Sequence, residues 1–169
     1  MIPENETREV KTMKRNMYEI NVEIHKSGVK GVPYCVNGKN CNGGEAAEIA
    51  YKDALGLVAV KDANGAFDIT DDIPELGASV KSKGFTLVNR KLGDTKDAIL
   101  DAYFEAVHST SFHYIRIDDS FKKLTAYIMN ATEFRTFLQK FGKMEAGRNV
   151  IRVKNETAEV VRWLERSAR

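Results

Sequence analysis

Apolar residues recur along this chain with two different periods, and the switching between them is what most limits the possible folds. Residues 18–24 alternate apolar and polar side chains, which is the pattern of a strand with one buried face. Residues 45–55 place apolar side chains at helical spacing, behind a cap formed by Asn42 and Glu45. Further strands are predicted at 57–60, 66–69, 78–88 (one strand or two short ones), 112–117, 124–129 and 150–153, and further helices at 94–108 (capped by Asp94), 130–141 (capped by Asn130 with Glu133) and 157–165. The sequence therefore predicts an α/β fold.

Length and composition fit a single globular domain over residues 1–169. The chain is 43% hydrophobic and 30% charged, which is enough apolar material to bury a core without disulfides. Residues 1–16 are expected to form a basic flexible arm, and the Gly- and Asn-rich residues 26–44 to form turns, a hairpin or a flexible loop. The spacing of Cys35 and Cys41 predicts reduced, unligated thiols.

Several functional classes are disfavoured by the sequence. No apolar run reaches 18 residues, and the first residues lack the order of a secretory signal, so a cytoplasmic location without membrane contact is expected. The chain has no Gly-x-Ser-x-Gly turn, which argues against serine hydrolysis. It also has no Walker loop, which argues against nucleotide hydrolysis.

Charge is distributed unevenly, although the net charge is only +2. Residues 40–80 carry eight acids against two lysines, a balance of −6, whereas residues 81–169 balance at +6. An acidic segment flanked by basic ones suits a nuclease, in which carboxylates bind metal and surrounding cations attract the polyanion. Ordinary solvated surface is the alternative explanation for the same distribution.

The segment Phe67–Lys83 places clustered carboxylates a few residues ahead of a lysine. Asp68, Asp72 and Glu75 are candidate oxygen ligands for a divalent cation. Lys81 is the candidate to position or activate water beside a scissile phosphate. Because Asp68 and Asp72 share one face of their predicted strand, antiparallel pairing with the next strand would bring them beside Lys81. The alternative is a cluster of acids in a turn together with a solvated lysine.

From Glu45 to Ile117 the predicted order is helix, three strands, helix and strand, and this order resembles the restriction-endonuclease-like nucleases. The resemblance implies an αβββαβ core with a mixed central sheet over residues 45–117, and a C-terminal extension of that core over residues 118–169. It also implies hydrolysis of phosphodiester bonds with Mg²⁺ or Mn²⁺ as the cofactor. In that core, the second strand supplies an aspartate, the third supplies a lysine, and the first helix often supplies a glutamate. These places would be taken by Asp68 or Asp72, by Lys81, and by Glu45 or Glu48.

The sequence departs from this pattern at Ser79, two residues before Lys81, where the family has a metal-binding carboxylate. One candidate replacement is Glu75, but six residues of extended strand span about 20 Å, so a bulge at Gly77 would be needed to bring it to Lys81. The other candidates are acids of the following helix, namely Asp94, Asp97, Asp101 and Glu105.

Taken with the resemblance, these residues predict a divalent-metal-dependent DNA endonuclease, for example a small restriction-type enzyme. Its partner would be DNA, most simply double-stranded, and cutting both strands implies a homodimer with two active sites. The alternative is a noncatalytic nucleic-acid-binding or protein-interaction module that keeps the nuclease fold. Expected phosphate contacts are Lys83, Arg90, Lys91, Lys30 and Lys39, and expected contacts to base edges are Asn37, Asn40 and Asn42.

Overall fold

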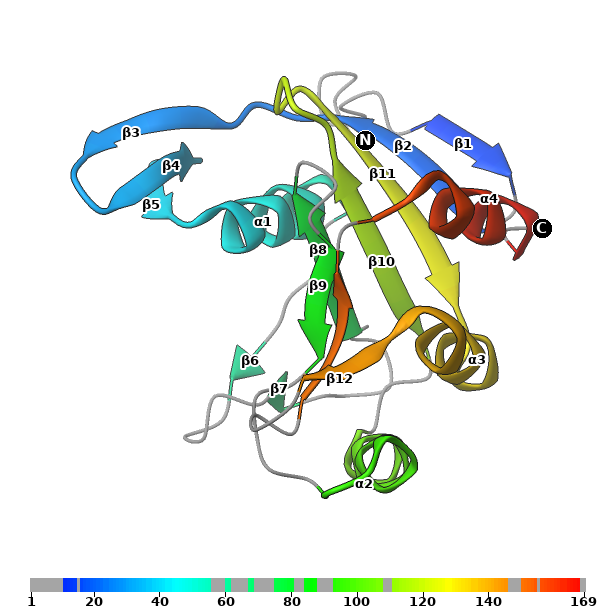
Figure 1. Ribbon diagram of the computed structural model, residues 1–169. Coiled ribbons are helices and arrows are strands. Elements are labelled where there is room, and N and C mark those ends of the chain that lie inside the picture. The colour runs from blue at the N-terminus through cyan, green and yellow to red at the C-terminus, as the bar shows by residue number, and fades with distance from the viewer. Residues whose placement is uncertain are drawn as a thin grey trace.

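The computed structural model describes residues 11–14, 16–55, 60–61, 67–68, 75–80, 84–87, 93–107, 111–145, 150–154 and 156–167. Helices and strands are mixed along these residues, so the α/β class expected from the sequence is confirmed (Figure 1). The helices are α1 (Gly43–Leu55), α2 (Lys96–Ala106), α3 (Ala131–Phe141) and α4 (Ala158–Ser167). None of the helices in this described part of the chain is long and apolar enough to cross a membrane.

The largest sheet has five strands. They are β1 (Lys11–Lys14), β2 (Met17–Asn21), β8 (Glu75–Val80), β10 (Phe112–Ile117) and β11 (Lys123–Met129), in the spatial order β1-β2-β11-β10-β8. β11 lies antiparallel to both β10 and β2. β8 lies parallel to β10, and parallel neighbours require a long crossover, which here contains α2. The sheet is therefore mixed, with its parallel pair at one edge.

An aromatic core covers one face of this sheet, beneath α2, α3 and α4. Side chains alternate along β10, so Phe112 and Tyr114 point to this face. Phe134 of α3 stacks on Phe112 with ring centroids 4.9 Å apart, and Phe137 meets Tyr114 edge-on at 5.3 Å. The other buried members of this core are Ile99, Leu100, Tyr103, Tyr127, Met129, Leu138, Ile151, Val153, Val160 and Leu164.

Helix α1 covers the opposite face of the sheet. Tyr51 of α1 is fully buried against Ile20 of β2 and Ile115 of β10. The cap expected from the sequence is present, since the Glu45 N–H donates to Asn42 Oδ1 at 2.9 Å. The five-stranded sheet is thus enclosed by helices on both faces (Figure 1).

Three smaller sheets surround this body. The first contains β3 (His25–Val29), β4 (Val32–Val36) and β5 (Lys39–Cys41), and it projects from the molecule beyond α1 (Figure 1). The others are β12-β13-β9, formed by Lys143–Glu145, Val150–Lys154 and Gly84–Leu87, and the hairpin of β6 (Val60–Lys61) with β7 (Phe67–Asp68). The hairpin among the alternatives for residues 26–44 is therefore confirmed. The Asn64-Gly65 pair predicts a hairpin between the strands expected at 57–60 and 66–69, and β6 and β7 do pair antiparallel.

Some boundaries differ from the sequence prediction. Residues 78–88 form two strands, β8 and β9, that belong to different sheets, which is the second of the two alternatives above. Thr95 rather than Asp94 caps α2, because its hydroxyl is the group that reaches the Ala98 N–H, at 3.1 Å. Residues 11–14, assigned to a flexible arm, instead pair with β2.

Residues 118–169 are also more central than an extension of a nuclease-like core. They contribute β11, which lies inside the five-stranded sheet between β2 and β10. They also contribute α3 and α4, whose buried residues fill the aromatic core. Residues 45–117 therefore share one packed unit with the rest of the described chain.

Candidate active site

The candidate active site lies where the parallel strands β8 and β10 both end. Their pairing closes with Ser79 opposite Arg116 and Val80 opposite Ile117. The predicted catalytic Lys81 follows Val80 directly in the sequence and lies outside the described residues. Open α/β sheets bind ligands in the crevice beyond the carboxyl ends of their parallel strands. This end is therefore where a site built on Lys81 would form.

Glu75 lies at the other end of β8. It pairs with Phe112, the first residue of β10, and the register then continues without a shift through Gly77 to Val80. The bulge at Gly77 that would bring Glu75 to Lys81 is absent from this pairing. Five steps of extended strand separate Glu75 from Val80 by about 17 Å. The register gives no support to Glu75 as the replacement for the carboxylate missing at Ser79.

The predicted aspartates are only partly covered by the structure. Asp68 belongs to β7, which pairs with β6 in a separate hairpin rather than with β8. The predicted antiparallel pairing of the aspartate strand with the lysine strand is therefore wrong for the described strands, because β8 is paired with β10. The remaining predicted residues that lie outside the described part of the chain are Asp72, Lys81, Lys83, Arg90 and Lys91.

Helix α1 carries the two glutamates predicted to assist the site. α1 packs against β8 as well as β10, so it is the helix nearest the proposed catalytic strand. Glu48 is half-buried in the middle of α1, and Glu45 lies in its first turn. Burial, and then the charge of Glu45, raise the pKa of the Cys41 thiol, which places Glu45 beside β5. Glu45 is thus placed beside β5, while Glu48 lies one turn further along α1.

The acids of α2 lie at the wrong end of the sheet to replace the carboxylate missing at Ser79. Phe104 of α2 packs against Phe112, where β10 begins, with ring centroids 5.5 Å apart. Figure 1 shows α2 at this end, away from the turn that follows β10. Asp101 moreover pairs with Arg135 of α3. The acids that do stand beside the end of β8 follow β10 directly, and they are Asp118 and Asp119.

An open pocket of about 520 Å³ occupies the carboxyl end of β10. It combines acidic, basic and hydroxyl side chains, and sequence reasoning had singled out none of them. The lining residues are Arg116, Ile117, Asp118, Asp119, Ser120, Lys123, Thr125 and Glu156. The pocket is polar enough to hold a charged ligand.

Within the pocket, Arg116 is held by a buried carboxylate. Arg116 Nε lies 2.5 Å from Glu156 Oε1, and the Tyr114 hydroxyl donates to Glu156 Oε2 at 2.9 Å. Only 1% of the Glu156 side chain is exposed, against 29% for Arg116. Burial acts to lower the pKa of Arg116, but the charge and hydrogen bond of Glu156 outweigh it, so that pKa is raised. Glu156 therefore fixes a charged guanidinium whose outer edge reaches the pocket.

Asp118 organises the turn between β10 and β11. Its carboxylate accepts hydrogen bonds from the Ser120 hydroxyl at 2.7 Å and from the backbone N–H groups of Lys122 and Lys123 at 3.2 and 3.3 Å. Burial acts to raise the pKa of Asp118, but these hydrogen bonds outweigh it, so that pKa is lowered. Phe121 adopts a positive φ of 57° in the same turn. Asp118 is thus engaged in holding the turn, while Asp119 is exposed beside it.

The described residues do not by themselves form a divalent-cation site. No group of three or more His, Cys, Asp or Glu side chains among them is placed to hold a metal ion. The hydrogen bonds on Asp118 occupy oxygens that a cation would need. The predicted ligand set therefore depends on Asp72 and on the Asp68 and Glu75 side chains, which the described part of the chain does not include.

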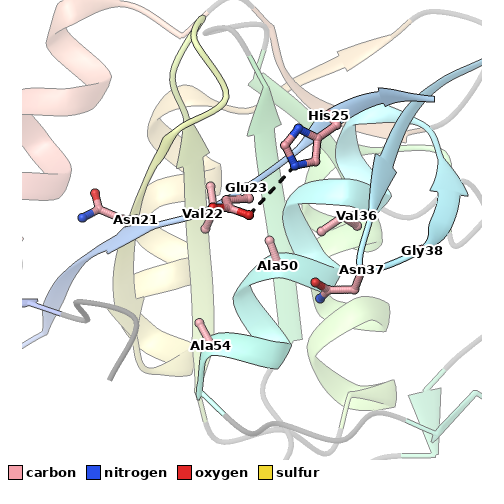
Figure 2. A pocket seen from close by; sticks show the side chains of 9 residues that line it. All are labelled: Asn21, Val22, Glu23, His25, Val36, Asn37, Gly38, Ala50 and Ala54. Carbon is pink, nitrogen blue, oxygen red and sulfur yellow. Dashed lines mark ion pairs between the residues drawn. The ribbon is translucent and has the colours of Figure 1, made fainter. Parts of the chain in front are cut away.

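A second pocket of about 260 Å³ lies where the β3-β4-β5 sheet meets α1 (Figure 2). Val36, Ala50 and Ala54 give it apolar walls. Glu23 and His25 form its polar side, with His25 Nε2 and Glu23 Oε2 4.0 Å apart. Both side chains are largely exposed, so this pair contributes little to stability.

His113 is buried in a hydrogen-bonded chain that the sequence did not reveal. Its Nδ1 lies 2.6 Å from the hydroxyl of Tyr51, and its Nε2 lies 3.3 Å from Ser111 Oγ. Burial lowers the pKa of His113 to about 4 and raises that of Tyr51. The neutral ring therefore donates one hydrogen bond and accepts one, with Tyr51 at Nδ1 and Ser111 at Nε2. With Tyr51 at 0% and His113 at 9% exposure, this chain is part of the core.

Comparison of the chain with protein-family models, with curated proteins and with solved structures finds no match.

Proposed function

We propose that this chain is a divalent-metal-dependent DNA endonuclease that hydrolyses phosphodiester bonds at the carboxyl end of β8. The observation that carries the proposal is the parallel β8–α2–β10 unit, with α1 packed on the face opposite α2. The order of a helix, a strand, a helix and a strand supports a restriction-endonuclease-like core, while β6 and β7, the other two strands that this core would need, pair in a hairpin of their own. In the sequence, Lys81 directly follows the last residue of β8, the end where such a core would carry out its chemistry.

Each proposed residue has a stated role. Lys81 orients the attacking water and stabilises charge on the phosphate. Asp68 and Asp72 would hold Mg²⁺ or Mn²⁺, and Glu48 would assist from α1, whereas the predicted ligand Glu75 lies at the opposite end of β8. The bound cation would lower the pKa of a coordinated water and would polarise the phosphate. Arg116, fixed by Glu156 at the same end of the sheet, suits contact with a phosphate oxygen.

Cleavage of supercoiled plasmid tests the proposal. The wild-type protein with Mg²⁺ or Mn²⁺ is expected to produce nicked and linear DNA, and Lys81→Ala is expected to cut about 10²–10⁴ times more slowly. Lys143→Ala is the matched control, because Lys143 is an exposed lysine of β12 in another sheet. Asp72→Asn is expected to behave like Lys81→Ala. Cleavage that survives the loss of Lys81 would refute the mechanism.

The same assay tests the homodimer. A dimer with two active sites converts supercoiled plasmid to linear product with little accumulation of the nicked form, whereas a single site accumulates nicked circles first. Binding of the plasmid without any cleavage, by wild-type protein in either metal, would favour the noncatalytic nucleic-acid-binding module instead.

A further inference from the structure

The β3-β4-β5 sheet packs on α1 through Val36 and Cys41, and its turn between β3 and β4 extends away from the rest of the molecule (Figure 1). Its third strand is short, because β5 pairs only with Tyr34–Val36 of β4. Beyond that pairing, residues 27–33 continue as a ribbon of two strands, here called the arm tip. The arm tip has residues 27–29 on β3 and 32–33 on β4, with a register shift between the strands, so at about 3.3 Å per residue it is about 7–10 Å long.

Internal hydrogen bonds fix the shape of the arm tip. The Ser27 hydroxyl oxygen accepts the Val29 N–H at 2.9 Å, and the hydroxyl donates to the Val32 carbonyl. Gly28 and Gly31 have φ angles of +74° and +82°, which glycine adopts without strain. The arm tip is therefore held in one conformation before it meets any partner, which reduces the entropy lost on binding.

The formally charged side chains of the β3-β4-β5 sheet are all positive. From Ile24 to Gly44 the chain has no aspartate or glutamate, but it has Lys26, Lys30 and Lys39. All three lysines are exposed. The acids nearest to the sheet lie at its base, where Glu23 lines the pocket of Figure 2 and Asp53 of α1 bonds to Asn37.

An apolar side chain stands at the end of the arm tip. Val29 is a large hydrophobic residue with 50% exposure, and it lies between Lys26 and Lys30 in the sequence. An exposed apolar residue flanked by lysines fits a partner whose surface has negative charges on either side of a recessed apolar strip. Duplex DNA has phosphates along its edges and methyl groups and base faces within its grooves.

We propose that the arm tip enters the major groove of double-stranded DNA, with Lys26 and Lys30 on the phosphates and Val29 against the bases, whereas Lys39 pairs with Val36 at the base of the sheet. This rests on the proposed function for the choice of DNA. The major groove is about 12 Å wide and 8.5 Å deep and admits a two-stranded β-ribbon, so its dimensions match those of the arm tip. The arm then anchors the substrate on an element separate from the carboxyl end of β8.

Binding of a fluorescein-labelled 30-base-pair duplex to the full-length protein, followed by anisotropy in EDTA, tests the arm without cleavage. Each phosphate contact adds about 0.9 to the slope of log affinity against log salt, which is about 8-fold in affinity at 0.1 M salt. The double variant Lys26→Ala, Lys30→Ala is expected to bind about 60-fold more weakly, with the slope reduced by about 1.8.

The matched control removes two positive charges elsewhere, in Lys140→Ala, Lys143→Ala. These side chains are exposed on α3 and β12, and the control is expected to keep affinity within about 3-fold of the wild type. Equal losses in the two double variants would overturn the proposal. Equal affinity for a single strand of the same length would also overturn it, because groove entry requires a duplex.

A second pair of variants tests the apolar end of the arm tip. Val29→Asp and Val29→Asn have nearly the same shape but differ in charge, and both replace an exposed residue that the fold does not need. Val29→Asp is expected to bind the duplex at least 8-fold more weakly than Val29→Asn, because it sets a carboxylate against DNA. Equal affinity of the two variants would show that Val29 does not approach the nucleic acid.

Failure of the arm and failure of the nuclease proposal give different results. If cleavage depends on Lys81 while the arm variants bind and cut like wild type, the arm proposal is refuted and the nuclease stands. If Lys81→Ala changes nothing while the arm variants lose duplex binding, the arm stands as the DNA contact of a protein whose catalytic assignment is wrong.

Discussion

Acidification should destabilise this protein through one histidine. His113 is buried against Tyr51, and its pKa is lowered from 6.5 to about 4. In the unfolded chain the imidazole gains a proton near pH 6.5, whereas in the folded protein it stays neutral until about pH 4. Stability from this site is therefore fully present above pH 6.5 and is lost as the pH falls toward 4.

The size of the effect follows from the two pKa values. Lowering the pKa of His113 from 6.5 to about 4 contributes at most about 3.4 kcal/mol to the free energy of unfolding. About 2.6 kcal/mol of this contribution is lost between pH 7.5 and pH 4.5. Carboxylates also lose charge in this range, so the wild-type curve alone cannot assign the loss to His113. The difference between wild type and a variant without the imidazole isolates it.

Urea unfolding at pH 7.5 and 4.5 provides the measurement. His113→Gln keeps an acceptor for the Tyr51 hydroxyl, and its loss of unfolding free energy between the two pH values should be about 2.6 kcal/mol smaller than that of wild type. The control His25→Gln removes an imidazole that is 72% exposed and should keep the wild-type difference. If His113→Gln and wild type lose equal free energy on acidification, the assignment to the buried ring is incorrect.

Two further predictions concern stability. Arg116→Met leaves the buried Glu156 carboxylate without its cation and should lower the unfolding free energy by about 3 kcal/mol, whereas the double variant Arg116→Met, Glu156→Gln should lose less. A double variant that is no more stable than Arg116→Met, measured by urea unfolding, would contradict this account of the pair. Asn130→Ala removes the capping-box bond that the Asn130 side chain accepts from the Glu133 N–H and should cost about 1 kcal/mol, against less than about 0.5 kcal/mol for the exposed Asn40→Ala. Thermal unfolding of both variants, followed by circular dichroism, checks the difference.

Local signals in the sequence located most helices and strands. The bounds of β10 agree with the prediction at both ends, because Phe112–Ile117 is an apolar run bounded by polar residues. The caps at Asn42 and Asn130 were found because each is followed three residues later by a glutamate. These features depend on neighbours in the sequence, so one short window contains the whole interaction.

Pairing between distant segments was not visible in this way. The residue pairs Tyr51–His113 and Arg116–Glu156 are 62 and 40 positions apart, and no window spans them. Turn residues between β6 and β7 predicted that hairpin correctly, but they carry no information on which sheet it joins. The placement of β8 beside β10, with its consequences for Glu75 and the acids of α2, therefore had to come from the structure.

One signal for the pocket was present and unused. Arg116 interrupts the apolar strand that runs from Phe112 to Ile117. A charged residue in a buried strand is stable only with a partner of opposite charge, so the sequence already required a carboxylate such as Glu156 nearby.

The position of β11 between β2 and β10 has a consequence for synthesis on the ribosome. Asn21 pairs with Lys123, about 100 residues later, so β2 has to wait for its neighbour while the chain is made. At roughly 5–20 residues per second this delay is on the order of 5–20 s. During that time β2 presents unpaired backbone groups and its apolar side chains to other nascent chains. The production of this protein in cells should accordingly depend on chaperones that shield early strands, and should suffer most when translation slows before residue 129.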